Sequence, residues 1–146
     1  GKHYLDLLKN TKKANLFIID EKKIDKSINY KIISFEKIKK EKIYFDFAII
    51  ASPSGLHFKH AEFFLKRKTN VLIEKPFVLR IDQAKKLINI AKNNKLKCWT
   101  SLQNRYNLSL IMLKKELRKK SLGKINLIDC TMLWHRNKKF FFRLFF

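Results

Sequence analysis

The sequence is poor in the residues that bend or cross-link a chain. Its 146 residues include only three glycines, two prolines and two cysteines. The turns must therefore rely on Asn, Asp, Ser and Lys. Cys98 and Cys130 lie in apolar stretches without metal-ligand spacing. This pattern excludes a disulfide framework and a zinc site, and it predicts a reduced, cytoplasmic protein.

Long apolar runs are absent as well. No stretch approaches the roughly 18 apolar residues of a membrane span, so we expect no membrane partner. The opening "GKHYLDLLKN" lacks the layout of a signal peptide, and it lacks an initiating Met. We therefore expect the chain to begin inside a longer protein. A hydrophobic content of 46% argues against disorder.

Acidic residues are scarce. The chain has 12 Asp and Glu against 34 Lys and Arg, which gives a formal net charge of +22. Such a charge favours salt-sensitive, non-specific binding to polyanions. Only six of the cations are Arg, and the Lys residues are spread along the whole chain. Nucleic-acid sites more often combine clustered Arg with exposed aromatics. A basic nucleic-acid-binding module is therefore the third of our hypotheses.

Helical periodicity and short apolar runs alternate along the chain. Strands that are apolar on both faces and alternate with helices predict a parallel sheet covered on both sides, within an α/β fold. We expect 15–20, 46–51, 70–74 and 97–102 to be parallel strands of one sheet. A further strand is predicted over 125–134. Helices are expected over 2–9, 35–42, 57–67, 81–93 and 108–120.

Polar residues follow four of the predicted strands. The carboxyl ends of parallel strands share one edge, where open α/β sheets bind ligands. Loops are polar in any case, so the pattern predicts a site without naming its chemistry. The four strand ends carry Asp20, then Ser52-Pro53, then Glu74-Lys75-Pro76, and then Gln103-Asn104-Arg105.

Asp20 has the position of a ribose-binding acid. In dinucleotide folds such an acid follows the second strand, about 20 residues beyond a glycine-rich turn. Gly1 stands where the last glycine of that turn would be. The alternative is that Asp20 merely ends a strand or caps the next segment. The spacing alone favours neither interpretation.

The motifs "AIIASPSGLH", "VLIEKP", "LQNRYN", "LGKI" and "LWHR", in this order, resemble the Gfo/Idh/MocA oxidoreductases. The resemblance extends to about residue 140 and is strongest to members that oxidise nucleotide-activated amino sugars or their uronates. It implies a Rossmann-type doubly wound domain over residues 1–104, lacking its first strand. It also implies the start of a second α/β domain for substrate and oligomerisation over residues 105–146.

The resemblance also implies roles for single residues. Lys75 would face the reacting carbon as the catalytic residue, and Asp20 would hold the adenosine ribose and favour NAD over NADP. Gln103 would approach the nicotinamide end, and Arg105 the substrate. The remaining cofactor side would be formed by Gly1, Ser52, Pro53, His57, Glu74 and Pro76.

Each of these residues also has an ordinary interpretation. Lys75 is one of 28 lysines and, taken alone, would be a solvated loop charge. Ser52 suits a turn, His57 the start of a helix, and Gln103 the end of a strand. The other histidines, His3, His60 and His135, are interpreted as surface or packing residues.

The chain departs from the family pattern at both ends. The first strand and most of the glycine turn are missing. The family pattern leads us to expect a Trp- and Gly-rich stretch with a catalytic His after "WHRNKKFF", where this chain has "FFRLFF". We therefore interpret the chain as a fragment of a dehydrogenase that transfers a hydride between a sugar or nucleotide-sugar carbon and NAD. We expect it to be inactive alone and to form homo-oligomers at full length. The alternative is a catalytically inactive binding remnant of the same fold.

Overall fold

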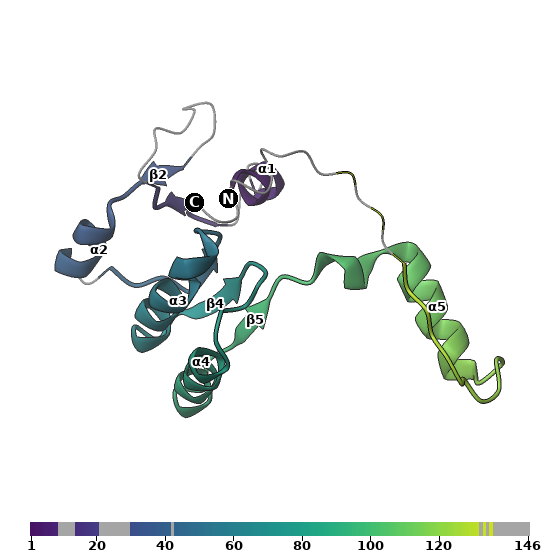
Figure 1. Ribbon diagram of the computed structural model, residues 1–146. Coiled ribbons are helices and arrows are strands. Elements are labelled where there is room, and N and C mark those ends of the chain that lie inside the picture. The colour runs from purple at the N-terminus through teal and green to yellow at the C-terminus, as the bar shows by residue number, and fades with distance from the viewer. Residues whose placement is uncertain (9–13, 21–29, 42, 132, 134, 136–146) are drawn as a thin grey trace. The chain divides into compact units, whose positions relative to one another are not determined.

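The computed structural model describes residues 1–8, 14–20, 30–41, 43–131, 133 and 135. The chain divides into two compact units, Gly1–Leu102 and Gln103–Phe146 (Figure 1). We call them the first and second unit. Their division lies close to the boundary predicted after residue 104, and the role of the second unit as a substrate domain stays a prediction.

The first unit alternates strands and helices, as predicted. Its strands are β1 (Phe17–Ile18), β2 (Lys31–Ile32), β3 (Phe47–Ile50), β4 (Asn70–Ile73) and β5 (Cys98–Thr100). Its helices are α1 (Lys2–Leu8), α2 (Phe35–Glu41), the short 3₁₀ helix η1 (Ser54–Leu56), α3 (His57–Lys66) and α4 (Ile81–Asn93).

Three of the predicted strands form one parallel sheet in the order β3-β4-β5. Ile50 pairs with Ile73, and Ile73 in turn pairs with Thr100. Helix α3 connects β3 to β4, and α4 connects β4 to β5. Connections of this kind let parallel strands lie side by side. The predicted parallel pairing of 46–51 with 70–74, and the two intervening helices, are confirmed.

The prediction that 15–20 joins this sheet is wrong. Strand β1 instead pairs with β2 in a separate two-stranded parallel sheet, with Phe17 opposite Lys31. Dinucleotide folds have the strand order 3-2-1-4-5-6. The orders β2-β1 and β3-β4-β5 correspond to the 3-2 and 4-5-6 parts of that order, and no described strand pairs with both β1 and β3.

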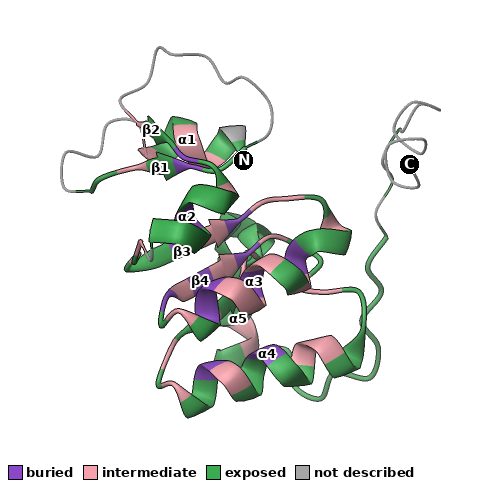
Figure 2. Ribbon diagram, turned by 90° about the vertical axis from the view of Figure 1, so that its left-hand side faces the viewer, coloured by how far each residue is buried: buried purple, intermediate pink, exposed green. Residues whose placement is uncertain are grey.

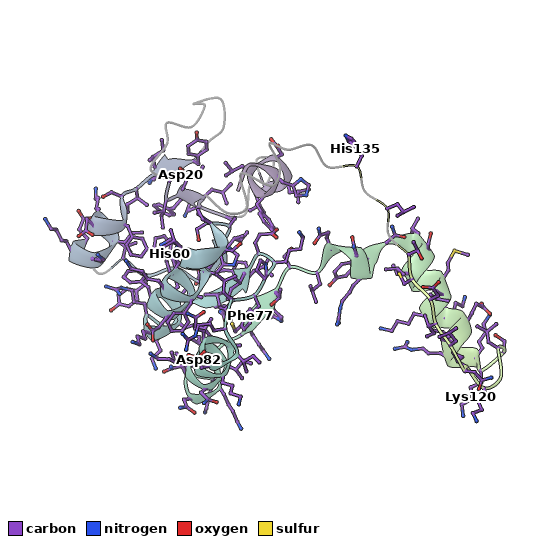
Figure 3. The ribbon with its side chains drawn as sticks, viewed as in Figure 1. Asp20, His60, Phe77, Asp82, Lys120 and His135 are labelled. Atoms are coloured by element: carbon purple, nitrogen blue, oxygen red, sulfur yellow. The ribbon has the colours of Figure 1, made fainter. Side chains whose placement is uncertain are left out.

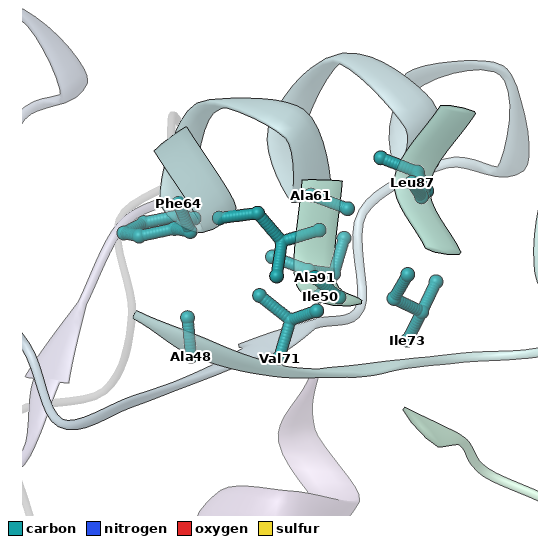
Figure 4. Packing of buried hydrophobic residues seen from close by; sticks show 9 residues of the cluster. Ala48, Ile50, Ala61, Phe64, Val71, Ile73, Leu87 and Ala91 are labelled. Atoms are coloured by element: carbon teal, nitrogen blue, oxygen red, sulfur yellow. The ribbon is translucent and has the colours of Figure 1, made fainter. Parts of the chain in front are cut away.

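The core lies between the three-stranded sheet and α3 and α4 (Figure 4). Alternate residues of β3 and β4 are buried, as the two-residue period of a strand requires. A fully buried aliphatic side chain contributes about 1.5–3 kcal/mol to stability, so this cluster is the main source of stability in the first unit. Its members are Ala48, Ile50, Ala61, Phe64, Leu65, Val71, Ile73, Leu87 and Ala91.

The opposite face of this sheet is only partly covered, so the expectation of a sheet covered on both sides is wrong. Phe47 and Trp99 are 43% and 47% exposed, with ring centroids 6.0 Å apart. Figure 2 shows how buried and exposed residues alternate along α3 and α4, which cover the other face. The apolar composition predicted which residues favour burial. It did not predict whether another segment of the chain would cover them.

The second unit contains η2 (Gln103–Tyr106) and α5 (Leu108–Lys119). The side chain of Asn107 caps α5, because its Oδ1 accepts a hydrogen bond of 2.9 Å from the Ser109 N–H. No residue of α5 is buried. The strand predicted over 125–134 does not form within the described residues 125–131. Trp134, Arg136 and the "FFRLFF" tail lie outside the described residues.

Candidate functional site

The carboxyl ends of β3, β4 and β5 form one edge of the three-stranded sheet. Its ladder continues past the strands, since Glu74 N–H donates to the Ile50 carbonyl and Ser101 N–H to the Ile73 carbonyl, each at 2.9 Å. Glu74 and Ser101 therefore stand at adjacent strand ends. In parallel sheets this edge is the usual place for a ligand, and the ligand site predicted here stays a prediction.

Glu74 is half-buried, and both of its carboxylate oxygens accept hydrogen bonds. Tyr4 of α1 donates its hydroxyl to Oε1 at 2.7 Å, and the Lys75 N–H donates to Oε2 at 3.0 Å. The Tyr4 oxygen also lies 2.8 Å from Ser101 Oγ. Partial burial raises the pKa of Tyr4, the Ser101 hydrogen bond opposes that shift, and the Glu74 carboxylate adds to it.

The sequence predicted a helix over 2–9 but did not reveal this contact of Tyr4. Seventy positions separate it from Glu74, and no local pattern encodes such a pair. The contact brings a phenol, a carboxylate and a serine hydroxyl together at the edge. These three side chains can accept hydrogen bonds from the hydroxyls of a ligand and donate hydrogen bonds to them.

Lys75 and Pro76 are both exposed at the same edge, and the peptide bond between them is cis. The backbone of Lys75 is held by its contact with Glu74. Its role toward a reacting carbon stays a prediction.

Ser52 and His57 come from the segment after β3. His57 is 1% exposed, and its Nε2 lies 2.9 Å from the Ser52 carbonyl while its Nδ1 lies 2.8 Å from the Pro76 carbonyl. His60, which was interpreted as a surface or packing residue, has Nδ1 at 3.0 Å from Ser52 Oγ and its ring 5.4 Å from that of Phe35. Backbone carbonyls thus occupy both ring nitrogens of His57. A direct contact of His57 with a cofactor stays a prediction.

The other predicted cofactor residues are exposed. Pro53 precedes η1, and Asp20 follows β1 by two residues (Figure 3). Gly1 directly precedes α1, and its carbonyl accepts the Tyr4 N–H at 3.0 Å. A Cβ added at Gly1 would meet no atom within 4 Å, so crowding does not require glycine there. Ligand contacts by these three residues stay predictions.

Gln103 and Arg105 belong to η2, in the second unit. Arg105 lines an open groove of about 540 Å³ together with Tyr106, Ile111 and the cationic side chains of Lys114, Lys115, Arg118 and Lys119. A second hollow, of about 330 Å³, lies at the amino ends of β3 and β4 between Tyr44 and Arg67. That hollow is at the edge opposite the predicted site.

In the described part of the chain, none of the helices combines the length and apolarity needed to cross a membrane. Nor do three or more His, Cys, Asp or Glu side chains gather there in a way that could hold a metal ion.

Residues 6–102 match the family GFO_IDH_MocA, which is described as an oxidoreductase family with an NAD-binding Rossmann fold. The chain is 28% identical over 88 residues to the uncharacterized oxidoreductase YhhX of Escherichia coli K12, covering 60% of this chain and 26% of YhhX. It is 33% identical over 75 residues to IolU of Bacillus subtilis 168, a scyllo-inositol 2-dehydrogenase (NADP(+)), covering 51% and 23%. The chain thus spans about a quarter of the length of these curated relatives.

Solved structures share the fold. The WlbA dehydrogenase of Bordetella pertussis, in complex with NADH and UDP-GlcNAcA, superposes with a TM-score of 0.75 at 21% identity, covering 84% of this chain and 38% of WlbA. The WlbA (WbpB) dehydrogenase of Thermus thermophilus, in complex with NAD and UDP-GlcNAcA, gives 0.68 at 23% identity, covering 81% and 43%.

Proposed function

The chain belongs to the Gfo/Idh/MocA oxidoreductase family, and from that premise we propose that its first unit binds the nicotinamide dinucleotide of a dehydrogenase. The substrate we propose is a sugar or nucleotide sugar that is oxidised at a hydroxyl-bearing carbon. NADP in the name of IolU, and NAD with UDP-GlcNAcA in the WlbA complexes, support these classes of cofactor and substrate.

The observation that carries the proposal is the carboxylate of Glu74 at the carboxyl end of the central strand β4. It is half-buried, held from two sides by Tyr4 and by the Lys75 N–H, and flanked by Ser101. A fixed carboxylate is an acceptor suited to the two hydroxyls of a ribose. The groups that hold it restrict its rotamers, which reduces the entropy lost when a ligand binds.

Lys75 is the group proposed for the chemical step. The nicotinamide supplies the hydride chemistry, and the protein aligns it. A hydride leaves a carbinol carbon readily only as the hydroxyl proton departs, so a positioned acceptor or relay is needed. We assign this role to the Lys75 amine, because Lys75 is exposed and follows Glu74 on the same edge.

Cofactor binding can be tested on the chain itself by titration with NADH, followed by nicotinamide fluorescence. Hydrogen bonds to charged groups contribute about 1.5–3 kcal/mol, so Glu74→Gln should weaken binding about tenfold or more. Glu41→Gln is the control, since Glu41 is exposed and its ion pair is with Lys37. Equal affinity of the wild-type and Glu74→Gln chains would remove Glu74 from the cofactor site.

Catalysis can be tested in a chimera in which this chain replaces the matching stretch of IolU. Lys75→Ala should lower kcat by about 10²–10⁴-fold while leaving the dinucleotide Kd nearly unchanged. Lys75→Arg should not restore the rate, because a guanidinium stays protonated. Lys85→Ala, an exposed lysine of α4, is the control. A normal kcat in Lys75→Ala would leave Lys75 as a solvated loop charge.

Asp20 is proposed to select NAD over NADP. A carboxylate that receives the ribose hydroxyls would repel a 2′-phosphate. NADH should therefore bind more tightly than NADPH, and Asp20→Ala should reduce the difference, whereas Asp46→Ala should not. Equal binding of both cofactors by the wild-type chain would contradict this role.

The chimera also tests the alternative function. If it binds the dinucleotide but shows no turnover, the alternative of a catalytically inactive binding remnant is favoured.

A further inference from the structure

His57, the first residue of α3, has an unusual pair of partners for a buried histidine. Its side chain is 1% exposed, so water does not satisfy its nitrogens. Nδ1 lies 2.8 Å from the Pro76 carbonyl and Nε2 lies 2.9 Å from the Ser52 carbonyl. Both distances are typical of N–H···O hydrogen bonds.

Both partners are carbonyl oxygens, which accept hydrogen bonds and cannot donate them. A neutral imidazole carries one N–H and one bare nitrogen, whereas the cationic ring carries two N–H groups. In the neutral ring, one bare nitrogen would face a carbonyl oxygen at hydrogen-bond distance, with two lone pairs opposed. The cationic ring instead makes two charge-assisted hydrogen bonds, which are stronger than neutral ones.

We propose that His57 is a positioning residue whose two ring nitrogens both donate, one to Ser52 and one to Pro76. The ring thereby ties the segment that follows β3 to the segment that follows β4. It fixes the position of Ser52 relative to Glu74 and Lys75. This role deepens the proposed function and rests on it, because those residues are the proposed cofactor and catalytic groups.

The charges nearby bear on whether a buried cation is tolerated. The two carbonyl oxygens are the partners that a charged, buried ring would need. Glu74 and Lys75 are the charged residues that directly precede Pro76 in sequence. On α3 itself, His60 lies one turn further on and contacts the Ser52 hydroxyl at 3.0 Å. Ser52 is therefore held through its carbonyl by one histidine and through its hydroxyl by another.

A test that needs no cofactor is nuclear magnetic resonance of the chain labelled with ¹⁵N in its histidines. At neutral pH, the His57 ring should show two protonated nitrogens whose N–H protons exchange slowly with water. The signals are assigned by their loss in His57→Gln, with His3→Gln, an exposed histidine, as the control. A His57 ring with one bare nitrogen would overturn the proposal.

The second readout is positional. In His57→Gln, the backbone amide signals of Ser52 and Lys75 should shift while circular dichroism stays unchanged, and NADH should bind about tenfold more weakly. Unshifted Ser52 and Lys75 amides, or unchanged affinity, would also overturn the proposal. If the wild-type chain binds no NADH, the proposed function fails, and the ring and amide signals still decide the role of His57.

Discussion

The β3-to-β5 part of the first unit and the second unit have similarly apolar sequences but very different burial. In the first, the apolar residues of β3 and β4 pack against α3 and α4. In the second, Leu108, Leu110 and Leu113 of α5 are exposed, as is Leu127 in the following segment.

The difference lies in the segments that come next along the chain. Each of β3 and β4 is followed by an amphipathic helix that returns the chain and covers the same sheet face. Residues 125–131, by contrast, pair with no described strand. A short apolar run becomes a stable strand only when it has neighbours to pair with. Amphipathic periodicity therefore identifies residues that favour burial, whereas the covering segments decide whether burial occurs.

The largest test of this difference compares two leucines. Leu65 on α3 is 0% exposed, and Leu127 is 84% exposed. Leu65→Ala should lower the free energy of unfolding by about 2–5 kcal/mol, whereas Leu127→Ala should change it by less than about 0.5 kcal/mol. Urea unfolding measures both. A similar loss in both variants would show that Leu127 is buried too, and the contrast between the units would disappear.

The two cysteines provide a second comparison, in chemical reactivity. Burial raises the pKa of Cys98 to about 11, and the thiolate is the reactive form. Cys130 is exposed. At pH 8 iodoacetamide should therefore alkylate Cys130 at least about tenfold faster than Cys98. Mass spectrometry of Cys98→Ser and Cys130→Ser chains separates the two rates. Faster modification of Cys98 would mean that β5 opens readily.

The smallest test compares two glutamates. Glu62 of α3 forms an ion pair with Lys86 of α4 at 2.9 Å, whereas Glu116 pairs within α5, with Lys119 at 2.8 Å. The hydrogen bond from Lys86 lowers the pKa of Glu62 more than its partial burial raises it. The stabilisation is therefore present above the ordinary glutamate pKa of about 4.3 and is lost as the pH falls through the lower folded value.

Glu62→Gln should accordingly cost up to about 1 kcal/mol near pH 7, and the loss should vanish in acid. Glu116→Gln should cost less, because Glu116 and Lys119 both lie on one exposed helix. Thermal unfolding at pH 7 and at pH 3 gives the four values. A loss in Glu62→Gln that persists at pH 3 would assign the effect to packing rather than to charge.

Local features of the fold could be predicted from sequence, and features that depend on distant segments could not. The bounds of α4 and the parallel pairing of β3 with β4 follow from periodicity. The separation of β1 from the main sheet does not, because strand pairing depends on segments that are distant in sequence. The exposure of Phe47 and Trp99 likewise depends on whether another segment covers their face of the sheet.

The candidate site shows the same division. Sequence placed Ser52, Glu74 and Lys75 at one sheet edge because strand ends in a parallel sheet coincide. It did not reveal that Tyr4 holds Glu74, nor that the His57 ring faces two backbone carbonyls, because contacts with distant backbone atoms leave no trace in residue spacing. His60 was interpreted as a surface or packing residue, because residue spacing could not reveal its contact with a serine hydroxyl eight positions earlier.

The central claim is that the dinucleotide binds at the carboxyl edge of β3-β4-β5. The most direct test is to add NADH to the ¹⁵N-labelled chain and to measure the shifts of its backbone amide signals. The predicted result is that Ser52, Glu74, Lys75 and Ser101 shift and that the shifts saturate at one Kd. The chain has a net charge of +22, so its cationic surfaces can also attract the phosphates of NADH. Lys114 and Lys115 in the α5 groove form one such competing surface. Shifts confined to that groove, and abolished by moderate salt, would contradict the claim.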